Sequence, residues 1–274
     1  MVAIGTDLMA SSSSDCKRSC RIELTAMART FKEWIRFLVF WIDFGFHYQV
    51  LATVLCIALL PFRGARKATI ATHKIIFSCY WPQLTVVNGT LDDFEKFEGV
   101  VASCHKGFFD FCIGGMYSSA FVGRMLAAIC VPFNSVLTFL GSGMYLVIRR
   151  GKFQEDPNAL VNKVKKFLED YPRLLVFPEG HRFQQRGLLR LRTGFIRICY
   201  GLGVPVMVAP MEGSQNIINE KTLTIRRGMP LVLVHGGVVS PEDYDDWKPF
   251  YEEFKTRFER AYDEACRVYD ELTA

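Results

Sequence analysis

The sequence contains a histidine and an aspartate at a spacing that acid–base chemistry can use. His105 and Asp110 are separated by four residues in the segment Cys104-His-Lys-Gly-Phe-Phe-Asp110, directly after an apolar run at 100–103. On a continuous helix, five steps rotate the chain by about 500°, so the two side chains would not share a face. They meet if His105 lies in the turn that leaves a strand and Asp110 lies in the first turn of the next helix. The carboxylate would then fix the imidazole tautomer and leave the other ring nitrogen as a base.

A second group of polar residues follows the apolar run at 173–177, in the segment Phe177-Pro-Glu-Gly-His-Arg182. Pro178 is expected to end the strand and Gly180 to let the backbone turn. Glu179 and Arg182 are then left at the carboxyl end of the strand, the edge at which open α/β sheets bind ligands. The alternative interpretation is an ordinary strand-end turn that carries a surface Glu/Arg pair.

Alternating strands and helices must position these two groups. Two amphipathic helices are predicted, one from Pro157 to Leu168 and one from Pro249 to Leu272. Strands are predicted at 84–87, 100–103, 126–131, 144–148, 173–177, 204–209, 222–225 and 230–235. Near-continuous apolar strands between helices predict an α/β fold with a mostly parallel sheet flanked by helices.

A membrane-embedded or interfacial helical segment is predicted to precede this domain. The 19 residues from Phe44 to Phe62 carry no formal charge, and as a helix they would span about 28 Å, close to the thickness of a hydrocarbon core. A buried core helix is the alternative, which His47 and Gln49 favour. We therefore divide the chain into a flexible tail at 1–24, a membrane-associated segment at 25–67, and the domain with both polar groups at 68–274.

Composition excludes several classes of protein. Half of the residues are hydrophobic and 22% are charged, which excludes a disordered chain. A net charge of +5 suits an anionic membrane surface or substrate, but not the dense basic surface of a nucleic-acid-binding protein. The nine cysteines and five histidines lack the spacings of zinc sites and disulfide frameworks. We expect free thiols in a reducing compartment and no metal.

Four segments in order resemble the conserved blocks of the glycerophospholipid acyltransferase superfamily, whose members acylate glycerol 3-phosphate, lysophosphatidic acid and other lysophospholipids. His105 and Asp110 match the HxxxxD block. Gly143 to Arg149 matches a Gly-x5-Arg block, with Arg150 as an alternative arginine. The matches to the third and fourth blocks are Phe177–Arg182 and Val204–Pro210. The resemblance covers about 84–240. Two departures are Cys104, where many members have Asn, and His181, where Thr or Ser is usual.

This resemblance implies acyl transfer from acyl-CoA, a co-substrate rather than a cofactor, to a hydroxyl of a glycerol-phosphate or lysophospholipid acceptor. His105 would be the general base, oriented by Asp110, and the acceptor hydroxyl would attack directly. Arg149 and Arg182 suit the acceptor's phosphate because guanidinium groups bind phosphate bidentately. Glu179 would hold acceptor hydroxyls or position an arginine, and Gly180 belongs to the same substrate-binding turn. Four further arginines could meet headgroups or CoA phosphates, or form a solvated face: Arg186, Arg190, Arg192 and Arg197.

Three alternatives remain at this stage. Cys112 and Ser103 flank the site, and a covalent Cys/His mechanism is one alternative. A transacylase would use the same His105–Asp110 pair with a different donor. A catalytically drifted acyltransferase-fold subunit would have a structural role in a membrane assembly, where the partners are lipids and other membrane proteins. The expected location is a membrane, that of the endoplasmic reticulum or mitochondrion in a eukaryote. The active site would face the cytosol or another reducing side.

Overall fold

The computed structural model describes residues 31–118, 120–123, 145–147 and 157–274. The chain divides into two compact units, Met1–Ile42 and Asp43–Ala274. The described part of the first unit, residues 31–42, is helical and belongs to α2 (Phe31–Phe44). The second unit contains all the strands among the described residues.

A six-stranded sheet forms the centre of the second unit, with the strand order β11-β6-β2-β5-β3-β4 among the described residues. The strands are β2 (Gly99–Ala102), β3 (Ala120–Gly123), β4 (Tyr145–Val147), β5 (Arg173–Val176), β6 (Val206–Val208) and β11 (Val238–Val239). All pairings are parallel except that of the edge strand β11 with β6. This is the α/β fold expected from the sequence, although the predicted strand at 126–131 lies outside the described residues.

The prediction of a single main sheet is wrong in one respect. Strands β1 (Gln83–Val87), β10 (Pro230–Val234) and β7 (Met211–Glu212) form a separate three-stranded sheet. Pro210 lies between β6 and β7. It lacks the N–H that a hydrogen-bond ladder between strands requires, so the strand is interrupted at this point. The strand predicted at 222–225 is shorter: β9 (Thr224–Ile225) pairs with β8 (Ile218–Asn219) in a small antiparallel hairpin.

The register of the central strands brings the two polar groups to the same edge of the sheet. Ala102, the last residue of β2, is paired with Val176 of β5 and with Val208 of β6. Parallel strands end on the same side, so the segments that follow Ala102 and Val176 emerge next to each other. Both strands are buried along their whole length, which explains why they read as continuous apolar runs.

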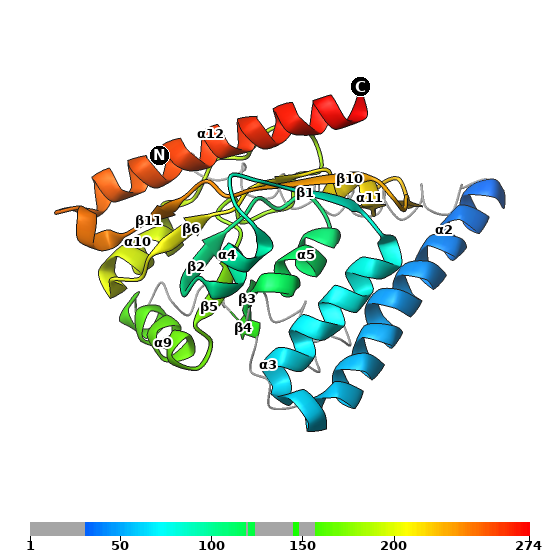
Figure 1. The fold of residues 1–274 in the computed structure, drawn as a ribbon, viewed down its shortest axis with the longest axis horizontal. Helices are drawn as coiled ribbons and strands as arrows, with labels where there is room; N and C mark the ends of the chain where they lie inside the picture. Colours follow the sequence, from blue (N-terminus) through cyan, green and yellow to red (C-terminus); the bar gives the residue numbers. More distant parts are fainter. Residues whose placement is uncertain (1–30, 119, 124–144, 148–156) are drawn as a thin grey trace, which may run out of the picture. The chain divides into compact units, whose positions relative to one another are not determined.

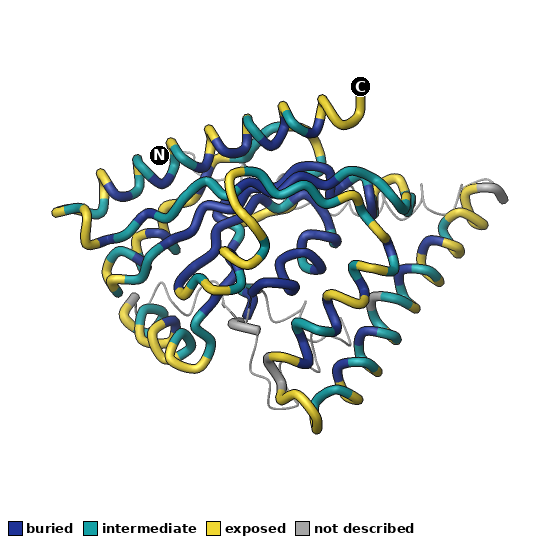
Figure 2. Tube along the Cα trace, in the orientation of Figure 1, coloured by how far each residue is buried: buried dark blue, intermediate teal, exposed yellow. Residues whose placement is uncertain are grey.

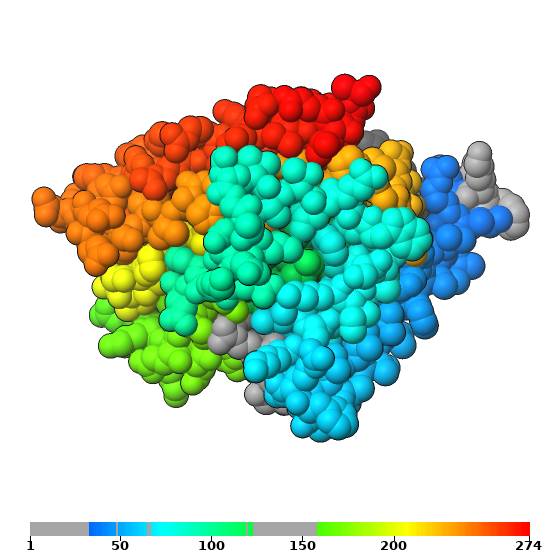
Figure 3. All heavy atoms as spheres, viewed as in Figure 1, coloured from blue at the N-terminus to red at the C-terminus, as the bar shows by residue number. Residues whose placement is uncertain are grey.

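Helices cover both faces of the sheets (Figure 1). On one side lies α12 (Trp247–Thr273), which buries Phe254 and Phe258 of the predicted amphipathic helix and also Phe250. On the other side lies α5 (Phe109–Tyr117), which is almost completely buried (Figure 2). In the space-filling view, atoms of α3 and α4 leave only a small part of it visible (Figure 3). The other described helices are α4 (Leu91–Lys96), α9 (Pro157–Asp170), α10 (Thr193–Leu202), α11 (Ser214–Ile217) and the 3-10 helix η2 (Pro241–Asp243).

The helices that precede the sheet continue further than predicted. A π-helical stretch, η1 (Gly45–Leu51), leads into α3 (Ala52–Tyr80), which breaks at Gly64, where φ is 70° and ψ is 162°. The part of α3 after this break packs on α5, with Phe77 stacked on Phe109. By length and composition the helix from Glu33 to Gly64 could cross a membrane, with a mean hydropathy of 1.6 over its most apolar stretch.

Gly213, which joins β7 to α11, supplies a test of the fold. It adopts φ +106°, and a Cβ there would lie 2.5 Å from the carbonyl oxygen of Pro230 and from the Tyr269 ring. We expect Gly213→Ala to lower the free energy of unfolding by about 1–3 kcal/mol or more. Gly201→Ala is the matched control, because a Cβ at Gly201 meets nothing within 4 Å, and it should be neutral or stabilise by up to about 1 kcal/mol. Chemical denaturation measures both, and equal stabilities would contradict the described backbone.

Candidate active site

The structure brings His105 and Asp110 into contact in the way the spacing predicted. His105 lies in the turn after β2, and Asp110 lies in the first turn of α5. The distance from His105 Nδ1 to Asp110 Oδ2 is 2.8 Å. The imidazole stacks on the ring of Phe177, with centroids 4.2 Å apart and an interplanar angle of 11°. Nδ1 is engaged and the ring is held on one face, so Nε2 is the nitrogen available to a substrate.

Asp110 is held by more than the histidine. Its side chain is fully buried, and Oδ2 accepts hydrogen bonds from the backbone N–H groups of Lys106, at 2.6 Å, and Gly107, at 2.8 Å. Oδ1 accepts a hydrogen bond from the hydroxyl of Ser214, at 2.5 Å. A buried carboxylate requires such donors. Ser214 was not among the residues predicted from the sequence, where its signal is a small hydroxyl residue after a glycine, shortly beyond the block that ends at Pro210.

Glu179 connects two loops of the site. It is 1% exposed, and its two oxygens accept hydrogen bonds from the backbone N–H groups of His105, at 3.0 Å, and Leu189, at 2.9 Å. Burial raises the pKa of this carboxyl, against the lowering effect of the two amide donors. The alternative of a surface Glu/Arg pair at this turn is therefore wrong, because Glu179 is buried and Arg182 pairs with Glu220 instead.

Gly180 makes the turn that the sequence predicted. Its φ is +70°, and a Cβ would lie 2.8 Å from the Arg192 side chain. Its N–H donates to the carbonyl of Phe177 at 2.9 Å. The glycine thus lets the chain fold back so that the side chain of Glu179 turns inward.

Arg182 lies beside the turn that carries the histidine. Its guanidinium group is 4.3 Å from the centre of the Phe108 ring, and Nη1 is 2.5 Å from a carboxylate oxygen of Glu220. Phe108 comes directly before α5, so Arg182 belongs to the same edge of the sheet as His105. The second predicted arginine, Arg149, and its alternative, Arg150, lie outside the described residues.

Two cysteines near the site are buried thiols. Cys104 donates to the carbonyl of Met211 at 2.8 Å and accepts from the same residue's N–H at 3.2 Å, so it joins the end of β2 to β7. Cys112 lies on α5 and contacts the carbonyl of His73. Burial raises the pKa of both thiols well above the usual value, which disfavours the thiolate that a nucleophile requires. The described residues contain no cluster of three or more side chains that could hold a metal ion.

Lys106, which follows the histidine, is an internal support. Its side chain is fully buried, and Nζ donates to the backbone carbonyls of Gln185 and Gly187. The same ammonium group lies 4.6 Å from the centre of the Tyr262 ring of α12. The turn after β2 is therefore fixed to the loop at 183–187 and to α12 as well as to Glu179.

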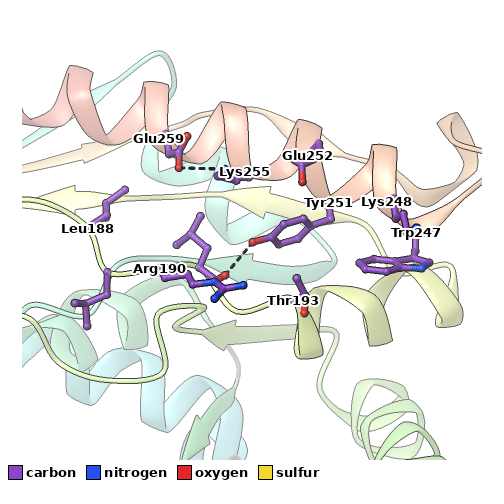
Figure 4. A pocket seen from close by; sticks show the side chains of 11 residues that line it. Leu188, Arg190, Thr193, Trp247, Lys248, Tyr251, Glu252, Lys255 and Glu259 are labelled. Carbon is purple, nitrogen blue, oxygen red and sulfur yellow. Dashed lines mark hydrogen bonds and ion pairs between the residues drawn. The ribbon is translucent and has the colours of Figure 1, made fainter.

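A groove of about 700 Å³ lies between residues 188–193 and α12 (Figure 4). None of the side chains proposed for chemistry lines it. Tyr251 closes part of it by donating to the carbonyl of Leu191 at 2.9 Å. Of the four further arginines, Arg190 lines this groove. Arg186 forms two 2.6 Å hydrogen bonds with Asp270, and Arg197 lies over Trp247.

Comparisons with known proteins show which family and which proteins this chain is similar to. The Acyltransferase family profile matches residues 90–211, which include the histidine, the aspartate, Glu179 and Arg182. The 1-acyl-sn-glycerol-3-phosphate acyltransferase of Haemophilus influenzae is 29% identical over 91 residues, which are 33% of this chain and 37% of that protein. The chain thus matches little more than a third of this relative's length.

The fold is similar to a solved structure. The 1-acyl-sn-glycerophosphate (LPA) acyltransferase PlsC from Thermotoga maritima superposes with a TM-score of 0.64 at 17% sequence identity, over 85% of this chain and 95% of that one. At this identity the similarity establishes the fold.

The two hydrogen bonds of Glu179 predict a local effect of its substitution. In Glu179→Gln an amide N–H₂ must face one of the two backbone donors, so one bond is lost. Because a hydrogen bond to a charged group contributes about 1.5–3 kcal/mol, whichever of the His105 and Leu189 amide protons loses its acceptor should exchange roughly 10 to 150 times faster. Hydrogen exchange measured by NMR or mass spectrometry tests this.

Two controls belong to this measurement. The amide of Val100, which donates to the carbonyl of Pro205 in the sheet, should keep its exchange rate. Glu264→Gln alters an exposed carboxylate that accepts one bond from Asn88, and it should leave both site amides unchanged. Unaltered exchange in Glu179→Gln would contradict the linking role.

Proposed function

We propose that the chain is a member of the glycerophospholipid acyltransferase superfamily, as the match of residues 90–211 to the Acyltransferase family supports, and that it transfers a fatty acyl group from acyl-CoA to a hydroxyl of a glycerol-phosphate or lysophospholipid acceptor. The observation that carries the proposal is the 2.8 Å contact between His105 Nδ1 and Asp110 Oδ2. It leaves Nε2 of a half-buried imidazole to accept a proton at the carboxyl edge of the sheet.

The proposed reaction is a direct transfer. The acceptor hydroxyl gives its proton to His105 Nε2 while its oxygen attacks the carbonyl carbon of the thioester. The tetrahedral intermediate collapses, the carbon–sulfur bond breaks, and the CoA sulfur takes the proton back from the imidazolium. Asp110 stabilises the imidazolium and holds the ring in orientation, and Ser214 acts through Asp110 as a positioning residue.

The surroundings favour this route over covalent catalysis. General base catalysis contributes about 10²–10⁴ in rate, and the ring stacked on Phe177 is already oriented for it. Cys112 is buried on α5 and hydrogen-bonded to a backbone carbonyl, and its raised pKa works against a nucleophilic thiolate.

Arg182 is the proposed phosphate-binding residue. Its guanidinium group lies over the Phe108 ring beside the turn of the base, and a guanidinium group offers several N–H donors in a fork that suits phosphate oxygens. We propose Arg149 for the same task from its place in the second block. Glu179 is assigned a supporting role, because both of its oxygens already accept backbone hydrogen bonds.

We also propose that the protein acts at a membrane, where its lipid substrates are found. The residues from Phe46 to Phe62 expose large apolar side chains to the surroundings, which costs free energy in water. These exposed residues are Phe46, Val50, Val54, Ile57 and Phe62. The described cysteines are all free, which fits an active site on the cytosolic or another reducing side.

The membrane proposal predicts the effect of two lysines. Val54 and Ile57 are about half exposed, so Val54→Lys with Ile57→Lys should leave the protein fold intact. A charge within the hydrocarbon core costs about 2.5–3.5 kcal/mol on insertion scales, so membrane association should weaken strongly. Flotation after an alkaline wash measures it. Leu272→Lys, a similarly exposed position on α12, is the control that should float like the wild type. A double variant that also floats normally would place the anchor elsewhere.

The central prediction concerns the two proposed catalytic residues. Full-length protein in detergent with labelled acyl-CoA and a set of lysophospholipids should form diacyl products. His105→Ala should reduce this rate by about 10²–10⁴. Asp110→Asn should also cost orders of magnitude, because its amide can stabilise the wrong tautomer.

Asp92→Asn, an exposed aspartate 3.8 Å from Lys96, is the matched control and should retain full activity. Denaturation curves should show that the variants remain folded. A fully active His105→Ala variant would overturn the mechanism, and a wild type inert with every donor and acceptor would overturn the function.

A further inference from the structure

The arginine proposed to bind phosphate already has a carboxylate partner. Arg182 Nη1 lies 2.5 Å from Glu220 Oε1, and the two side chains are 37% and 17% exposed. The other oxygen, Oε2 of Glu220, is buried and has no hydrogen-bond partner among the described residues. The pair therefore carries no net charge, and one of its carboxylate oxygens remains unsatisfied.

The backbone fixes Glu220 in this place. It follows β8 at the tip of the β8–β9 hairpin. There the side chain of Asn219 accepts hydrogen bonds from the N–H groups of Lys221, at 3.1 Å, and Thr222, at 3.0 Å. Such an Asx turn restrains the backbone of the tip, from which the side chain of Glu220 reaches Arg182.

The hairpin also lies directly against the turn that carries the base. A Cβ placed on Gly107 would be 3.3 Å from the carbonyl oxygen of Ile218 and 3.9 Å from Oε2 of Glu220. Gly107 is two residues after His105, and its N–H donates to Asp110. Glu220 is thus within a few ångströms of the loop that must receive the acceptor.

Charge decides which acceptor headgroup suits this arrangement. A phosphate monoester carries close to two negative charges at neutral pH, and it would meet Glu220 as well as Arg182. A headgroup with a phosphodiester and an ammonium group has one charge of each sign. It can place its phosphate on the free N–H groups of Arg182 and its ammonium group beside the carboxylate of Glu220, which leaves no charge unpaired.

We propose that the acceptor is a lysophospholipid with a zwitterionic headgroup, recognised by the Arg182–Glu220 pair. This inference rests on the proposed acyl transfer and names its substrate class. Glu220 is the specificity-determining residue, and phosphate monoesters such as lysophosphatidic acid are the poorer acceptors. The relative from Haemophilus influenzae is named for a monoester acceptor, so the inference separates this chain from it.

The test compares acceptors in full-length protein with one acyl-CoA. Lysophosphatidylcholine and lysophosphatidylethanolamine carry the ammonium group, lysophosphatidylglycerol is a phosphodiester without it, and lysophosphatidic acid is a monoester. The wild type should have the highest kcat/KM for the two zwitterionic acceptors. In Glu220→Gln the ratio of kcat/KM for lysophosphatidylcholine to that for lysophosphatidic acid should fall at least about 10-fold.

Two further variants sharpen the comparison. Glu220→Asp keeps the charge and should keep the order of acceptors. Glu253→Gln removes the carboxylate of another Arg–Glu pair, that with Arg257 on α12, which has a 2.5 Å contact and similar exposure. It should leave the acceptor ratio unchanged.

A binding measurement separates this inference from the proposed function. Calorimetric titration with glycerophosphocholine and with glycerol 3-phosphate requires no acyl donor and no turnover. One outcome is a protein that shows no acyl transfer and still binds glycerophosphocholine more tightly than glycerol 3-phosphate, with a preference that is lost in Glu220→Gln. In that case the headgroup inference stands while the proposed acyl transfer fails. A wild type that prefers monoesters, or a Glu220→Gln variant with unaltered preference in both assays, overturns the inference.

Discussion

The buried carboxylate of Asp110 is the interaction on which the rest of the site depends. A fully buried charge is stable only when donors surround it, and here the donors come from three places: the imidazole of His105, the backbone of the following turn, and the hydroxyl of Ser214. The need to satisfy one charge therefore determines the path of the turn after β2, the start of α5 and the position of α11. Because the histidine is one of these donors, its orientation follows from the same requirement.

A second buried carboxylate connects the turn after β2 to the loop after β5. Glu179 binds the backbone N–H of His105 on one side and that of Leu189 on the other. The Lys106 ammonium group donates to two backbone carbonyls of the 183–187 loop. The loop after β5 is thus held at both ends by groups that also hold the loop after β2. Such preorganisation matters for the reaction rate. A catalytic group that is already held in position costs no free energy of ordering when the transition state forms.

The sequence predicted the parts of this arrangement that arise from local chemistry. Apolar runs identified β2 and β5, and the spacing of His105 and Asp110 required the strand–turn–helix path that the structure has. Contacts between residues far apart in the sequence could not be predicted from such local patterns. Glu220 reaches Arg182 from a hairpin whose first strand, β8, is two residues long, too short for periodicity to detect. Glu179 was expected to hold acceptor hydroxyls or to position an arginine, because nothing in a sequence shows that two backbone amides from distant loops converge on one carboxylate.

The packing of α5 shows how closely the site and the preceding helices are connected. Gly114 and Gly115 face different neighbours: a Cβ on the first would overlap the side chain of Leu175 in β5, and one on the second would overlap the ring of His73 in α3. The glycines therefore allow α5 to approach the sheet and α3 at the same time. Burial lowers the pKa of His73 to about 4, so this ring is neutral and packs as an apolar group with one hydrogen bond to the carbonyl of Thr69. Because α5 begins at the residue before Asp110, these contacts also fix the start of the helix that carries the carboxylate. The turn that holds the base is thus packed, through α5, against the part of α3 that follows Gly64.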